Sequence, residues 1–104
     1  MKYILLLNQK YLVMKDYREA LDKEALEAVF TDYFLPFDYI VGDWAYGKLR
    51  LKGFNSKTNA NFKDYNDVDK IEEYLNNYCA YGCKYFILSK EQPYNACLFN
   101  SFLL

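Results

Sequence analysis

The sequence predicts an α+β fold: a single small domain with a largely antiparallel or mixed sheet and two helices packed on it. Two observations lead to this prediction. Along the chain, the apolar patterning changes between strand-like and helix-like periods in the order β-β-α-β-β-α-β. Neighbouring strands occur twice with only a short turn between them, which favours hairpins over a strand–helix–strand repeat. A chain of 104 residues has room for one core, so we expect one domain over residues 1–90 and an apolar tail over 91–104.

The first two strands are expected at Tyr3–Leu7 and Tyr11–Met14. Both are short apolar runs, and the polar residues Asn8–Lys10 between them are typical of a hairpin turn. The mixed segment Lys15–Leu21 either begins a helix or leads toward one.

The first helix is expected to follow Asp22, whose side chain is suited to capping an N-terminus. Glu24 and Glu27 fall in the first turns, where the helix dipole favours negative charge. Pro36 must end the helix, because a residue before proline avoids helical geometry. The buried stripe is predicted from apolar residues at positions i, i+3, i+4 and i+7: Leu26, Val29, Phe30 and Tyr33.

Residues 37–54, FDYIVGDWAYGKLRLKGF, are predicted to form two strands joined by a tight turn at Gly47. A loop at Tyr46-Gly47 pairs Asp43 with Arg50, whereas a loop at Ala45-Tyr46 pairs Asp43 with Lys48. Both registers sort the side chains in the same way. One face is expected to join the core, through Ile40, Leu49 and Leu51. The other is expected to meet solvent or a partner, through Tyr39, Val41, Asp43, Lys48, Arg50 and Lys52.

The second half of the chain begins with a polar loop, Asn55–Asn66, that could be mobile or functional. A second helix is expected from Asn66-Asp67 onward and to end at Gly82, with a stripe of Ile71, Leu75 and Tyr78. The last strand is expected at Lys84–Ser89. The tail ends ACLFNSFLL, which is apolar enough to pack back on the domain or to drive self-association.

Composition narrows the possible functions. The net charge is −1 and histidine is absent, so no global charge favours nucleic acid, and the commonest metal ligand is missing. The first ten residues hold too short an apolar run for a signal peptide, and no run reaches transmembrane length. We therefore expect a cytoplasmic protein with no membrane partner and no cofactor.

Two motifs are rejected as sites. Gly42–Lys48 matches the start of a phosphate-binding loop, but Leu49 replaces the required Ser or Thr and a strand follows in place of a helix. Three cysteines without histidine make a poor zinc set, and their odd number argues against a disulfide framework. Packing thiols are the simplest interpretation of Cys79, Cys83 and Cys97.

Charge is unevenly distributed along the chain. Residues 16–43 hold eight acids and two bases, for a net charge of −6, whereas residues 44–63 hold five bases and no acid. The basic segment Trp44–Lys63 also carries Trp44 and Tyr46 at the turn, and basic residues combined with aromatics suit single-stranded nucleic acid or an acidic protein surface. The alternative is that these cations pair with the acidic first helix of the same domain.

A catalytic carboxylate pair is a further alternative. Asp38 and Asp43 flank a buried-looking strand, and pairs of carboxylates can perform acid–base chemistry. Capping, turn formation or ion pairing with Lys48 or Arg50 explains the same residues without catalysis.

Two blocks of sequence resemble the YutD-like family of small bacterial proteins. The first is Phe37–Trp44 followed by Leu49–Phe54, and the second is Tyr78–Leu88 with its Tyr-Cys-x-aromatic-Gly-Cys segment. Tyr11 and Asp16–Arg18 fit the start of the family pattern. The resemblance covers about residues 3–90 and implies a compact α/β domain in Firmicutes-type bacteria, without catalytic residues to carry over. It marks as motif positions Asp43, Trp44, Arg50, Gly53, Cys79 and Cys83.

The sequence therefore favours a small cytoplasmic binding module over an enzyme. The expected ligand is nucleic acid or a nucleoprotein, and the residues expected to bind it are Asp43, Trp44, Tyr46, Lys48, Arg50 and Lys52. The alternatives are a protein-interaction or self-association module and, less favoured, an enzyme or metal protein that uses Asp38 with Asp43, or Cys79 with Cys83.

Overall fold

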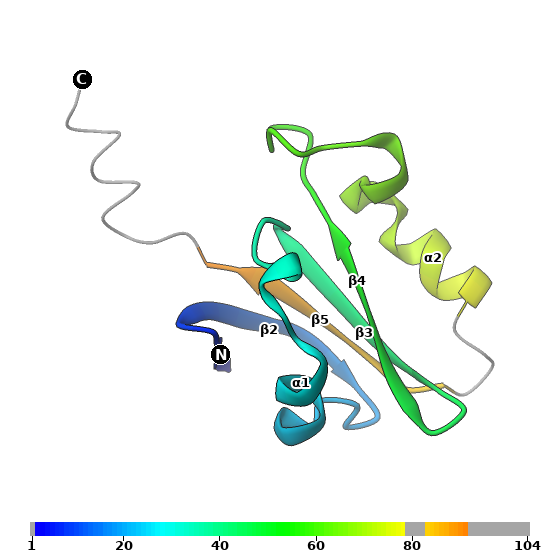
Figure 1. Cartoon of the computed structure of the whole chain (residues 1–104). Coiled ribbons are helices and arrows are strands. Elements are labelled where there is room, and N and C mark those ends of the chain that lie inside the picture. The colour runs from blue at the N-terminus through cyan, green and yellow to red at the C-terminus, as the bar shows by residue number, and fades with distance from the viewer. Residues whose placement is uncertain (1, 79–82, 92–104) are drawn as a thin grey trace.

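The computed structural model describes residues 2–78 and 83–91 (Figure 1). These residues form one five-stranded sheet and two α-helices, which confirms the predicted α+β class and element order. The elements are β1 (Tyr3–Leu6), β2 (Gln9–Tyr17), α1 (Lys23–Val29), β3 (Tyr39–Ala45), β4 (Lys48–Phe54), α2 (Ile71–Tyr78) and β5 (Tyr85–Lys90). Short 3-10 turns are η1 (Asp32–Phe34), η2 (Asp64–Asn66) and η3 (Val68–Lys70).

All neighbouring strands of the sheet are antiparallel, in the order β1-β2-β5-β3-β4. The last described strand, β5, therefore lies in the middle, between the two hairpins (Figure 1). The two edges of the sheet are β1, which has four residues, and β4, which has seven. The longer edge strand is the one with the alternating Lys–Leu–Arg–Leu–Lys sequence.

The first hairpin differs in detail from its prediction. Its turn is Leu7-Asn8, and both residues have positive φ. Gln9 and Lys10, predicted to lie in the turn, instead start β2 and pair with Leu6 and Leu5. A two-residue loop with positive φ matches the right-handed strand twist, so the strands can begin directly beside it.

The second hairpin follows the first of the two predicted registers. Tyr46 and Gly47 form the loop, with φ of 53° and 75°, and Asp43 lies opposite Arg50. Trp44 lies opposite Leu49 in the same ladder. Residues 42–48, which resemble the start of a phosphate-binding loop, therefore form the end of β3, the hairpin turn and the start of β4.

The first helix starts as predicted but is shorter. The Asp22 side chain accepts a hydrogen bond from the Ala25 amide at 3.1 Å, which confirms the cap. The helix ends because Phe30 takes an extended conformation, with ψ of 125°. Its ring packs edge-on against Tyr11, with centroids 5.7 Å apart. Tyr33, predicted in the buried helical stripe, lies in η1 and is 67% exposed.

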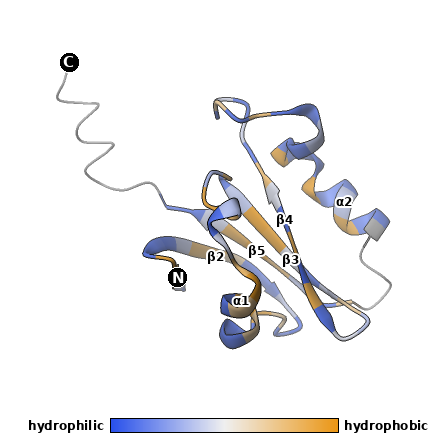
Figure 2. Cartoon of the chain, in the orientation of Figure 1, coloured by the Kyte–Doolittle hydropathy of each residue, from blue (hydrophilic) through white to orange (hydrophobic). Residues whose placement is uncertain are grey.

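The core lies between α1 and the sheet. Its fully buried side chains include Tyr11, Leu26, Ile40, Phe86 and Leu88. Figure 2 shows hydrophobic residues along β3 and β5, with α1 in front of the sheet. Leu49 and Leu51 pack against the same core, as their alternation predicts.

The opposite face of β3 is buried as well, which corrects a prediction. Val41 and Asp43 have no exposed surface, although alternation placed them on the face for solvent or a partner. The reason is tertiary: β3 lies between β5 and β4. Residues of α2 line a groove of about 760 Å³ together with Tyr85 and Ile87 of β5, so α2 lies over this side of the sheet.

The cysteine interpretation needs a correction too. Cys83 is disulfide-bonded and is not a free packing thiol. An odd number of cysteines excludes complete pairing but still allows one bridge. Cys79 and Cys97, the predicted end of α2 at Gly82 and the apolar tail lie outside the described residues.

Within residues 2–78 and 83–91, no helix is long and apolar enough to span a membrane.

Candidate binding groove at the edge of β4

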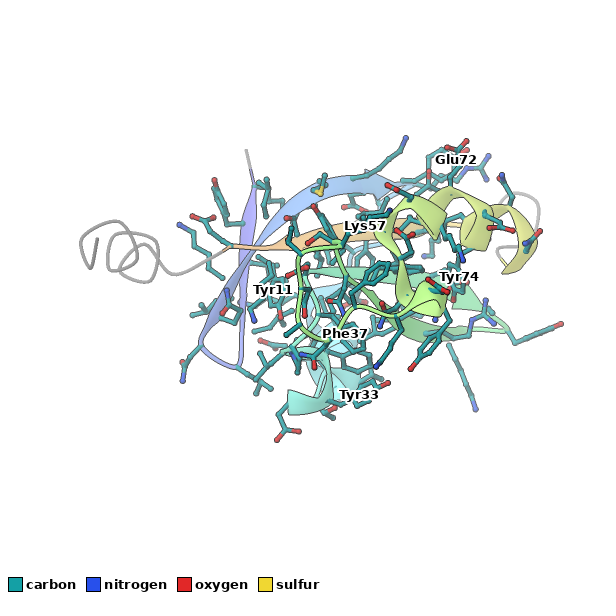
Figure 3. All side chains as sticks on the ribbon, turned by 90° about the horizontal axis from the view of Figure 1, so that it is seen from above. Tyr11, Tyr33, Phe37, Lys57, Glu72 and Tyr74 are labelled. Carbon is teal, nitrogen blue, oxygen red and sulfur yellow. The ribbon has the colours of Figure 1, made fainter. Side chains whose placement is uncertain are left out.

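A groove of about 370 Å³ runs along the open edge of β4. One wall comes from η1 and the residues after it, and the other comes from η2 and α2. In Figure 3, Tyr33 and Phe37 lie on one side and Tyr74 on the other. The lining residues are Tyr33, Phe34, Phe37, Arg50, Leu51, Lys52, Gly53, Tyr65, Asn66 and Tyr74.

The groove walls are aromatic and accessible. Tyr33 is 67% exposed and Tyr65 is 72% exposed, although most aromatic side chains of a folded domain bury their rings. Tyr33 is supported by Phe34 and Phe37, with ring centroids 5.0 and 5.6 Å away. The rings on this wall therefore brace one another.

Gly53 allows the wall to close on the strand. A Cβ atom at this position would lie 2.2 Å from the Phe37 ring, so only glycine lets that ring pack directly on β4. The neighbouring segment begins with Asp38, whose amide donates to Asn55 at 3.0 Å. The wall is thus fixed to the end of β4 by packing and by a hydrogen bond.

Asn55 organises the loop beyond β4. Its side-chain oxygen accepts from the amide of Asp38 and from Asn59, while its side-chain nitrogen donates to the Asn61 carbonyl. Its backbone NH donates to Asn66 at 2.6 Å, and its carbonyl accepts from Val68 at 3.0 Å. The polar loop predicted as mobile or functional is therefore closed around a buried asparagine.

Arg50 and Asp43 form an ion pair across the hairpin. Their backbones are direct partners in the ladder, and the guanidinium donates to Oδ2 of the carboxylate. Asp43 is fully buried, whereas the Arg50 side chain is 43% exposed. The hydrogen bond to Asp43 raises the pKa of Arg50 above its usual value, so the guanidinium keeps its charge.

Lys52 lies beside the aromatic wall of the groove. Its Nζ atom is 5.3 Å from the Phe54 ring centroid and 5.9 Å from that of Tyr74. These two rings pack edge-on at 5.7 Å. A cation placed over ring faces is stabilised and still presents its charge to the groove.

The other predicted basic residues are distributed differently. Lys57 pairs with Asp69 at 2.8 Å and with Asp67 at 3.2 Å, and these hydrogen bonds raise its pKa. The backbone of Lys63 donates to the Asn66 side chain at 2.7 Å. The carboxylates that hold Arg50 and Lys57 thus belong to β3 and the start of η3, not to the acidic first helix.

Trp44 and Tyr46 occupy opposite environments. The Trp44 indole packs against the core and donates from Nε1 to the Ala20 carbonyl at 2.8 Å, with Lys84 over its ring. Tyr46 is fully exposed at the hairpin tip, next to exposed Lys48. The structure therefore divides the predicted binding residues between the core, the hairpin tip and the groove.

The two acids of the catalytic alternative have structural partners. Asp38 accepts from the backbone NH and the hydroxyl of Ser56, at 2.9 and 3.0 Å. Asp43 is held by Arg50. Among residues 2–78 and 83–91, no group of three or more His, Cys, Asp or Glu is placed to hold a metal ion.

Sequence reasoning missed the aromatic half of the groove. The helical spacing predicts Tyr33 in a buried stripe, and Tyr65 falls in a loop without a pattern. Phe37 and Tyr74 belong to segments far apart in the sequence. The only available signal was the surplus of aromatic residues, 20% of the chain, which does not say where they gather.

Comparison with known proteins agrees with this fold. The family described as "YutD-like: Putative antitoxin YutD-like" matches residues 6–89. The chain belongs to the YutD-like family. It is 37% identical over 87 residues to "Putative antitoxin YutD" of Bacillus subtilis (strain 168), covering 84% of this chain and 96% of that protein.

A solved structure supports the same assignment. The solution NMR structure of protein yutD from B. subtilis superposes with a TM-score of 0.73 and 35% sequence identity. The match covers 88% of this chain and 84% of that one. The predicted family and fold class are therefore confirmed.

Proposed function

We propose that this chain is a protein-binding module and that its binding site is the groove along β4. The observation that carries the proposal is an accessible aromatic groove at an open strand edge, with Tyr33 and Tyr65 as its exposed walls. Aromatic side chains at concave surfaces are typical anchors of protein interfaces. The B. subtilis relative carries the name "Putative antitoxin YutD", which is consistent with a protein that acts by binding a partner.

The distribution of charge supports a protein partner over nucleic acid. Of the basic residues in Trp44–Lys63, Arg50 and Lys57 are paired with carboxylates of the same chain. Trp44, predicted to be a binding residue, packs against the core. A phosphate backbone would thus meet few uncompensated cations, and the whole chain carries a net charge of −1.

The test is affinity capture of proteins from a lysate of a Firmicutes-type bacterium. The wild-type chain is compared with a Tyr33→Asn/Tyr65→Asn variant and with Tyr46→Asn. Tyr46→Asn is the control, because it removes a fully exposed tyrosine outside the groove and places Asn before Gly47, which suits the turn. We expect the wild type and the control to retain the same proteins and the groove variant to lose them. Unchanged capture by a folded groove variant would contradict the proposal.

Nucleic-acid binding is the second candidate, favoured by Tyr46 and Lys48 at the hairpin tip. We expect polarisation of a labelled mixed-sequence single strand to rise at low salt and to fall with Lys48→Glu, if this candidate holds. Arg50→Glu is unsuitable as a test because it would leave the buried Asp43 without its cation. No detectable binding at low salt would eliminate the candidate.

A further inference from the structure

We propose that the partner adds an extended segment to the sheet as a sixth strand beside β4, and that this segment alternates apolar and acidic residues. The inference rests on the proposed function and specifies the chemistry of its partner. It follows from the backbone of β4, from the two side-chain rows of that strand and from the charge of the groove.

The backbone of β4 has hydrogen-bonding groups that face away from the sheet. Around a two-residue turn, the residues that flank the loop form a hydrogen-bonded pair, and such pairs then recur at every second position. Here the flanking pair is Ala45–Lys48, so Arg50 and Lys52 also bond to β3. The NH and C=O groups of Leu49, Leu51 and Gly53 therefore point to the open edge, a length that about five extended residues can follow.

The chain already completes this edge at one end. Beyond β4, Asn55 forms a parallel bridge with Asp67, through hydrogen bonds to Asn66 and Val68. That bridge lies directly after Gly53 and Phe54. The groove continues the same edge toward Lys48, so an added strand would extend a pairing that the fold itself uses.

The side chains beside the edge form two rows of different chemistry. Leu49 and Leu51 lie on the core side, where Phe34 and Phe37 also pack. Arg50 and Lys52 lie on the opposite side. Arg50 is already paired with Asp43 of β3, whereas Lys52 has no carboxylate partner among residues 2–78 and 83–91, so Lys52 carries the uncompensated charge of this row. Cross-strand neighbours sit on the same face, so a complementary strand presents apolar residues to one row and acidic residues to the other.

The same charges disfavour two other occupants. A second copy paired through β4 would place Arg50 and Lys52 against the same cations of its neighbour, and lysines on edge strands oppose such pairing. The chain's own last segment, residues 92–104, contains no Asp or Glu. A partner segment that alternates apolar and acidic residues complements both rows.

The experiment uses a fluorescein-labelled peptide that repeats Val-Glu over about six residues, with a Val-Lys peptide as the charge control. The wild-type chain is compared with Lys52→Glu and with Lys23→Glu, the same charge change at an exposed site on α1. We expect the wild type and Lys23→Glu to bind the Val-Glu peptide alike. Lys52→Glu should bind it at least about tenfold more weakly and gain affinity for the Val-Lys peptide.

Hydrogen exchange provides the second readout. Addition of the Val-Glu peptide should protect the amides of Leu49, Leu51 and Gly53 and leave exposed amides of α1 unchanged. The proposal is overturned if the Val-Glu peptide fails to bind, if both peptides bind equally, or if these three amides remain unprotected. Protection of the same amides in the free chain with a dimeric mass would also overturn it, in favour of self-pairing. Because capture by the Tyr33 and Tyr65 walls is measured separately, loss of this inference leaves the proposed function standing.

Discussion

At the scale of single residues, the structure buries two polar groups whose burial the sequence pattern does not predict. The Tyr11 hydroxyl and one carboxylate oxygen of Asp43 are buried, and neither has a hydrogen-bond partner among the described residues. Such groups are costly, because they lose water without a replacement. Their effects differ, since Tyr11 is neutral whereas Asp43 is charged and paired with Arg50.

Tyr11 makes stability depend on alkaline pH. Burial raises its pKa from 10.0 to about 12. Between these values the unfolded chain releases a proton that the folded chain keeps, so the contribution is complete below pH 10.0 and is lost as the pH rises toward 12.

We predict that Tyr11→Phe reduces this alkaline loss of stability and changes the free energy of unfolding at neutral pH by less than about 1 kcal/mol, because the hydroxyl has no partner. Urea unfolding at several pH values measures both effects. Tyr33→Phe, at an exposed tyrosine, should retain the wild-type pH dependence; an identical profile for Tyr11→Phe would contradict the prediction.

Arg50 is predicted to matter more for stability than an exposed arginine usually does. Arg50→Met leaves the buried Asp43 without its cation and should lower the free energy of unfolding by about 2–4 kcal/mol. Arg50→Met with Asp43→Val should recover most of that loss, because it removes the unpaired charge. Urea unfolding of the single and double variants measures the energetic coupling between Arg50 and Asp43. Equal loss of stability in both variants would contradict the prediction.

At the scale of elements, the β3–β4 hairpin depends on glycines for different reasons. A Cβ atom at Gly42 would lie 2.2 Å from the Phe86 ring, which packs directly on the strand backbone. A Cβ atom added at Gly47 would have no atom within 4 Å beyond its own residue and its chain neighbours, but φ is +75°. The first position is limited by space and the second by backbone conformation.

We therefore predict that Gly42→Ala destabilises the fold by about 2–3 kcal/mol through overpacking, whereas Gly47→Ala costs about 1 kcal/mol of backbone strain. Thermal unfolding measures the difference. In a Phe86→Leu background, Gly42→Ala should lower the stability by less than it does in the wild-type chain. A larger cost at Gly47 than at Gly42 would show that packing of Phe86 is not the constraint.

At the scale of the whole molecule, the two faces of the sheet are covered unequally. The α1 side holds most of the buried side chains, among them Leu26 with no exposed surface. On the other side, Ile71 and Leu75 of α2 are only half-buried and border the groove of about 760 Å³. The α2 layer should therefore be the less stable part of the domain.

This asymmetry predicts different costs for equivalent truncations. Leu26→Ala should lower the free energy of unfolding by about 3 kcal/mol, and Leu75→Ala by about 1 kcal/mol. Native-state hydrogen exchange should also show faster exchange in α2 than in β3 and β5. Equal exchange in the helix and the central strands would contradict the prediction.

Local patterns predicted much of the fold. Strand alternation identified the hairpin 37–54 and left two registers open, of which the structure has the one that pairs Asp43 with Arg50. The Asp22 cap was correct, and the element order holds along the described chain. Errors arose where tertiary contacts override local preference: Phe30 leaves the helix to pack on Tyr11, and Val41 is buried although its face was expected to be open.

The sequence by itself determined the family, the α+β class and the division of β4 into an apolar and a basic row, because these follow from short-range periodicity and motif. Only the tertiary structure decided which strand forms an edge and which aromatic residues gather beside it. Tyr33, Phe37, Tyr65 and Tyr74 come from separate segments, and strand order depends on how hairpins pack on β5. Contacts between residues far apart in the chain leave no periodic trace in it, and the groove consists of such contacts.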